Sequence, residues 1–133
     1  KTGKSKHYPL GTTVTLRANA RRYFLLAYTL MDSNSTASST TDGVWNSLSE
    51  LWKAVRRESN GSCVCIPLIG GGQSKLSPFL PAVDSVRFIA LSFVLASRTA
   101  RICEELRIVA PPKEFDKLDH LEIQAFLNSL RPS

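Results

Sequence analysis

One stretch constrains the fold of this chain more than any other: residues 63–76, which read CVCIPLIGGGQSKL. The apolar run 64–69 is rich in β-branched residues and too short for a helix, so it predicts a buried strand. Gly70, Gly71 and Gly72 follow directly, where the strand is expected to reach the edge of a sheet and lead into a helix. In an open α/β sheet, ligands bind at the carboxyl ends of the strands.

A glycine turn in this position is suited to hold an anion. Glycines allow positive φ angles and a close approach of the backbone, and successive N–H groups can then form a concave nest. The following helix adds the positive end of its dipole. The predicted ligand is a phosphate or pyrophosphate, and the predicted site comprises Leu68, Ile69, Gly70, Gly71, Gly72, Gln73, Ser74 and Lys75. The alternative, to which we give equal weight, is a structural turn that binds no ligand. Lys75 would then be a solvated surface charge.

Composition places the chain among globular domains. Its 133 residues can form one domain with a core, and 43% hydrophobic with 21% charged residues argues against disorder. The net charge of +6 favours anionic partners. No basic stripe interleaved with aromatic residues is present, so a nucleic-acid groove is not predicted.

The cysteines and histidines offer little chemistry. Cys63 and Cys65 would face the same side of a strand, which is a poor geometry for a disulfide between them. Buried free thiols in a reducing cytoplasm are the simplest interpretation. His7 and His120 have no ligand spacing relative to the cysteines, so no metal site is predicted.

The remaining periodicities predict alternating strands and helices. Strands are expected at residues 12–18 and 23–30, and the short link between these two predicts an antiparallel hairpin. Further strands are expected at 64–69 and 106–110, where the strand–helix–strand order predicts parallel pairing. A polar loop is expected at 32–41. Helices are expected from Thr41 or Asp42 to about Gly61, at 82–97, and after Asp119, the last one burying Leu121, Ile123, Phe126, Leu127 and Leu130. The run at 23–30 predicts burial on both faces. Together these elements predict an α/β sandwich of three layers, a mixed sheet with helices on both faces.

No signal peptide or membrane span is evident in the sequence. The most apolar stretch, 83–96, contains Asp84 and Arg87 and has the length of a core helix. The chain begins with Lys1, and we expect it to be a piece of a longer protein.

Four stretches resemble a known family. They are Tyr8 to Thr13 (YPLGTT), the aromatic-rich Tyr23 to Tyr28, Leu51-Trp52, and Ile66 to Gly70 (IPLIG). In this order they resemble a macro domain, and more closely the macro-like domain of bacterial Thoeris anti-phage effectors. The resemblance covers Lys4 to Leu130, and IPLIG is its specific part.

The resemblance implies a single macro-like domain over residues 1–133 that lacks the N-terminal strands. It implies that the loop matching Gly70 to Ser74 wraps the diphosphate of ADP-ribose or of an ADP-ribose conjugate. Pro111 and Lys113, which follow the last strand, would lie near the adenine side. The acidic residue and the first ligand loop of a macro domain have no match in this chain, so they are expected upstream. The resemblance implies no cofactor other than this ligand.

The resemblance implies that, in the Thoeris systems, a TIR enzyme makes an ADP-ribose-type signal from NAD and an effector that contains a macro domain senses it. The leading expectation is a sensor without enzymatic activity, acting through self-association of the full effector. The domain would be cytoplasmic, in a protein anchored in the bacterial inner membrane by a region outside this sequence. ADP-ribosyl hydrolysis and a plain protein-interaction module are the alternatives. No poised nucleophile or base is visible near the glycine loop.

Overall fold

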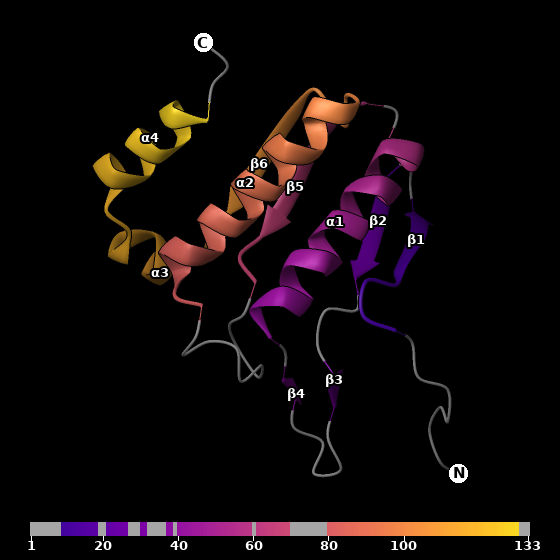
Figure 1. Ribbon diagram of the computed structural model, residues 1–133, viewed down its shortest axis with the longest axis horizontal. Helices are drawn as coiled ribbons and strands as arrows, with labels where there is room; N and C mark the ends of the chain where they lie inside the picture. Colours follow the sequence, from indigo (N-terminus) through magenta and orange to yellow (C-terminus); the bar gives the residue numbers. More distant parts are fainter. Residues whose placement is uncertain are drawn as a thin grey trace.

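The computed structural model describes residues 9–18, 21–26, 30–31, 37–38, 40–59, 61–69 and 80–130 (Figure 1). The elements in chain order are β1 (Thr13–Ala18), β2 (Arg21–Leu26), β3 (Leu30–Met31), β4 (Ala37–Ser38), α1 (Thr41–Glu58), β5 (Cys63–Pro67), α2 (Ala82–Thr99), β6 (Glu105–Val109), α3 (Pro112–Lys117) and α4 (His120–Ser129). The predicted α/β class is confirmed.

The strands pair in three two-stranded units within the described residues. β1 and β2 form the predicted antiparallel hairpin, with Thr13 opposite Leu26. β5 and β6 are parallel, with Cys63 opposite Glu105, so α2 is the crossover helix between them. The prediction of mixed parallel and antiparallel pairing is therefore confirmed, and the described strands pair in these separate units. β3 and β4 are an addition, because β4 lies in the predicted polar loop.

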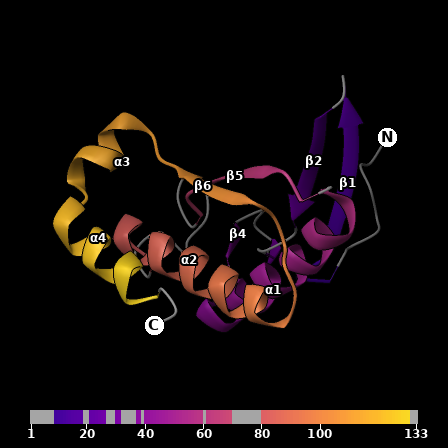
Figure 2. The same cartoon turned by 90° about the horizontal axis from the view of Figure 1, so that it is seen from above.

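The core lies between the strands and one layer of two helices. Figure 2 shows α1 and α2 running along the same side of β5 and β6. Fully buried side chains of α1 and α2, including Leu48, Trp52 and Ile89, form its centre. The indole Nε1 of Trp52 donates a hydrogen bond of 2.9 Å to Ser92 Oγ on α2. A buried indole N–H needs such a partner, so this bond fixes the two helices relative to each other.

The strands bury only one face in the described part of the chain. Val64 and Ile66 of β5 pack toward the helices, whereas Cys63 and Cys65 are exposed. The predicted burial of these two thiols is wrong, because side chains alternate between the faces of a strand and only one face has a helix layer. Only Cys103 is a buried thiol.

The same alternation applies to β2. Phe24 and Leu26 pack against the core, whereas Tyr23 and Leu25 are about half exposed. The prediction that this run is buried on both faces is wrong.

Helix ends follow local hydrogen bonding. The Oγ1 of Thr40 accepts a hydrogen bond of 3.0 Å from the Gly43 backbone N–H, so Thr40 caps α1 in place of Thr41 or Asp42. Asp119 caps α4 as its sequence predicted, with Oδ1 accepting from Glu122 N at 3.1 Å. None of the described helices is long and apolar enough to span a bilayer.

The C-terminal helices differ most from the prediction. α3 was not predicted from the sequence; Pro112 occupies its first helical position, which suits proline. α4 has the predicted apolar residues, but none of them is buried, and Leu121 is 84% exposed. The prediction of a buried side for this helix is wrong.

Candidate functional site

The carboxyl ends of β5 and β6 meet at one edge of the structure. The two strands are parallel, and the Leu68 N–H continues their pairing by donating a 3.1 Å hydrogen bond to Val109 O. Leu68 and Ile69, two predicted site residues that follow β5, thus lie at the same edge as Pro111, a predicted site residue that follows β6. Pro111 is the N-cap of α3 and is exposed. The structure therefore brings together residues more than 40 positions apart that the sequence had assigned to one site.

A buried serine attaches the start of α2 to this edge. Ser85 is fully buried in the first turn of α2, and its Oγ accepts a hydrogen bond of 2.9 Å from the Ile69 backbone N–H. This hydrogen bond attaches Ile69, the last described residue after β5, to α2. Sequence reasoning missed Ser85, because nothing in a serine's local sequence indicates a partner 16 residues earlier.

Among the described residues, no side chain caps the N-terminus of α2. Pro81 is the N-cap residue, and its carbonyl accepts the first helical hydrogen bond from Ser85 N at 2.9 Å. Proline has no side-chain acceptor, so the backbone N–H groups of the first turn are not satisfied by the cap. These groups and the helix dipole give this end of α2 a positive character that suits an anion.

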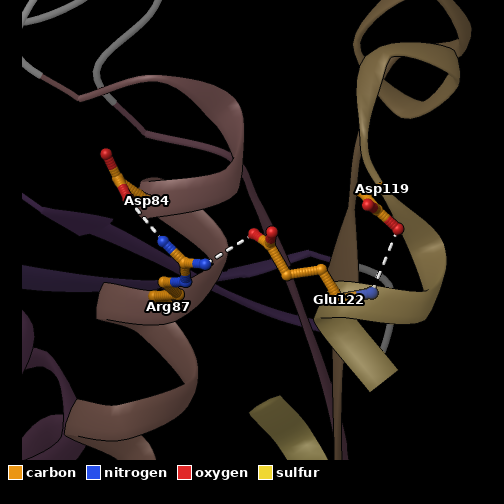
Figure 3. A network of polar contacts seen from close by, with 4 residues as sticks. All are labelled: Asp84, Arg87, Asp119 and Glu122. Carbon is orange, nitrogen blue, oxygen red and sulfur yellow. Dashed lines mark hydrogen bonds and ion pairs between the residues drawn. The ribbon is translucent and has the colours of Figure 1, made fainter. Parts of the chain in front are cut away.

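The charged side chains of this turn are paired with each other. Asp84 would repel an anion, but Arg87 Nη1 lies 3.2 Å from Asp84 Oδ1. Arg87 also reaches Glu122 of α4, with Nη2 2.6 Å from Oε1 (Figure 3). Arg87 therefore offsets the charge of one of these two carboxylates, and the cluster keeps a net negative charge.

The glycine loop itself is not placed. Gly70, Gly71, Gly72, Gln73, Ser74 and Lys75 lie outside the described residues, and their predicted contacts with a ligand stay a prediction. Lys113 is exposed on the short helix α3, one turn after the edge. Its predicted place near the adenine side is untested.

A large groove opens next to this edge. It has a volume of about 1030 Å³ and lies between α2, β6 and the α3–α4 segment. Leu68 and Ala110 line it at the edge, and its walls are mostly aliphatic and aromatic, including Val86, Phe93 and Ile108. Its size is at the upper end of small-molecule pockets, and its apolar lining suits the flat face of a nucleobase.

His120 has a structural partner, and the thiol of Cys63 has a raised pKa. A ring nitrogen of His120 lies 3.1 Å from Phe115 O, and the two rings contact each other at a centroid distance of 4.4 Å with their planes tilted by 45°. Although Cys63 is exposed, desolvation around its sulfur raises the pKa of the thiol, Cys65 and Glu105 add to the rise, and Arg107 opposes it. A thiol that stays protonated is a weak nucleophile. Among the described residues, no cluster of His, Cys, Asp and Glu could hold a metal ion.

The comparison with protein families shows which family the chain belongs to. The model for "Thoeris protein ThsA, Macro domain" matches residues 1–111. This chain belongs to that family. No curated protein matches the chain significantly. The family match ends at Pro111, earlier than the expected Leu130, so α3 and α4 lie beyond the matched region.

Proposed function

We propose that this domain binds an ADP-ribose-type ligand at the carboxyl edge of β5 and β6 and serves as a sensor in Thoeris defence. The observation that carries the proposal is the bond from Ile69 N–H to Ser85 Oγ. It places an uncapped helix N-terminus directly beside the end of the strand that leads into the glycine loop. Membership of the Thoeris macro-domain family supports the choice of ligand.

The chemistry of the edge supports a ligand with both charged and flat apolar parts. The first turn of α2 offers backbone N–H groups to a diphosphate. The groove that begins at Leu68 and Ala110 offers an apolar surface to a base. A free phosphate would use only the first of these features, and a nucleoside only the second. An ADP-ribose-type molecule uses both.

The proposal also covers the source of the ligand, the response to it and the location of the domain. The signal is made from NAD by a TIR enzyme, and binding activates the effector through self-association. The domain faces the cytoplasm, in a protein held in the bacterial inner membrane by a region outside this sequence. The family match supports only the Thoeris context of these statements.

Calorimetric titration with ADP-ribose tests the binding. We expect ADP-ribose to bind, and AMP and ribose 5-phosphate to bind at least ten-fold more weakly, because each lacks part of the ligand. Ser85→Ala should weaken ADP-ribose binding, because the start of α2 loses its attachment to β5. Ser49→Ala is the matched control: its hydroxyl donates to Trp45 O within α1, at 3.2 Å and away from the edge. Equal affinity for all three compounds, or an equal effect of both variants, would contradict the proposed site.

Product analysis separates the sensor from the hydrolase. A sensor leaves the ligand intact after prolonged incubation, whereas an ADP-ribosyl hydrolase releases free ADP-ribose from a conjugate. Chromatography of an ADP-ribosylated peptide after incubation with the protein distinguishes them. Release of ADP-ribose at a rate proportional to protein concentration would replace the sensor proposal by the enzymatic one.

A further inference from the structure

Two exposed thiols share one face of β5. Cys63 and Cys65 are two residues apart in this strand, so their side chains leave it on the same side. Val64 and Ile66 pack against the core on the opposite side, along which α1 and α2 run (Figure 2). Both thiols are exposed, whereas Cys103 is buried. The strand therefore presents a pair of thiols to solvent.

The spacing of this pair suits a bridging ion better than a disulfide. Each residue of a parallel strand advances about 3.3 Å, so the Cβ atoms of Cys63 and Cys65 are about 6.6 Å apart. A disulfide needs Cβ atoms about 3.5–4.5 Å apart. A bond from a thiolate to zinc is about 2.3 Å long, and an ion of similar size bound in line by two sulfurs holds them about 4.6 Å apart. Small rotations of the two side chains toward each other provide this separation without distorting the strand.

The two sulfurs act on each other, and the charges beside them nearly cancel. Desolvation raises the pKa of the Cys63 thiol, Arg107 opposes the rise, and the charge of Cys65 and a hydrogen bond with it add to the rise. Cys63 lies opposite Glu105 and Cys65 opposite Arg107 on β6. Glu105 and Arg107 pair with each other, so together they bring little net charge. A cation bound by both sulfurs would remove the repulsion between two thiolates.

The number and softness of the ligands select the ion. In the described parts of the chain, no group of three or more His, Cys, Asp and Glu could hold a metal ion, and a zinc site usually needs four ligands. Soft thiolates favour copper(I), which also binds two ligands in line. We propose that Cys63 and Cys65 form a copper(I)-binding dithiol on the exposed face of β5. Binding one Cu⁺ releases both thiol protons and leaves a bis-thiolate complex of charge −1, with no change of oxidation state.

Anaerobic titration of the full chain with copper(I) tests this site. The copper(I) is supplied as its coloured complex with bathocuproine disulfonate, so that loss of colour reports transfer of the ion to the protein. We expect one copper ion per chain and no change of oligomeric state in gel filtration. Cys63→Ser and Cys65→Ser should each lower the affinity by about 100-fold or more, because a single thiol loses the gain from two linked ligands.

Cys103→Ser is the matched control. This thiol is buried, and its Sγ lies 3.6 Å from Glu105 O. We expect its replacement to leave copper binding unchanged, and an equal loss in all three variants would refute a site made of two ligands. Unchanged affinity in Cys63→Ser or in Cys65→Ser would refute it as well, because thiols that act separately tolerate the loss of one. One copper ion per two chains, with a dimer in gel filtration, would show that the ion joins two copies and would also overturn the proposal.

Discussion

Replacing Ser85 by alanine should destabilise the domain out of proportion to the atom removed. The Ser85 side chain has no exposed surface, and its Oγ is the acceptor for the Ile69 backbone N–H. Removing it leaves a part-buried donor without a partner, which costs about 1–3 kcal/mol. The better helix propensity of alanine returns about 0.5 kcal/mol. We therefore expect a net loss of about 0.5–2.5 kcal/mol.

Urea unfolding followed by circular dichroism measures this loss. With a slope of about 1–3 kcal/mol/M, the midpoint should fall by about 1 M at an unchanged slope. Ser49→Ala provides the reference, because its hydroxyl donates to Trp45 O, a carbonyl within α1, and its loss leaves no buried donor unpaired. A midpoint for Ser85→Ala equal to that of Ser49→Ala would refute the argument that Ser85 attaches α2 to the end of β5.

Three further results are expected. Ser92→Ala should cost about 1–3 kcal/mol in urea unfolding, because the buried Trp52 indole N–H loses its acceptor; a loss below about 0.5 kcal/mol would mean that another group replaces it. Gly11→Ala should lower the melting temperature, because Gly11 has φ +90°, a conformation that costs an L-residue about 1–2 kcal/mol. Cys63 and Cys65 should both react with a thiol reagent in the folded protein. Because the pKa of the Cys63 thiol is raised, its reaction rate should increase at a higher pH than the reaction rate of free cysteine. Equal pH profiles for Cys63 and free cysteine would contradict this prediction.

Much of the site's framework could be predicted from the sequence because it depends on local patterns. The short apolar run before Gly70 predicted a strand, and the strand–helix–strand order predicted the parallel pairing of β5 with β6. The Asp119 cap of α4 was likewise local, since it joins residues three apart. Pattern and spacing were sufficient in these cases.

The features that could not be predicted from the sequence depend on which surfaces of the helices and strands pack against each other. An apolar run does not reveal how many faces of a strand are covered, so the exposure of Cys65 and Tyr23 was missed. The apolar residues of α4 indicated a buried side, but α4 and α2 face each other across the groove. The roles of Ser85 and Arg87 depend on partners 16 and 35 residues away in the chain, and no local signal specifies such partners.

Thermal unfolding with and without ADP-ribose tests the central claim most directly. A ligand at about 100 times its dissociation constant stabilises the native state by about 2.7 kcal/mol. We expect a clear rise in melting temperature with ADP-ribose or a conjugate, and a loss of that rise in Gly71→Val, where the predicted loop can no longer approach the ligand closely. An unchanged melting temperature with every ADP-ribose compound would contradict the account, and the glycine loop would then be a structural corner.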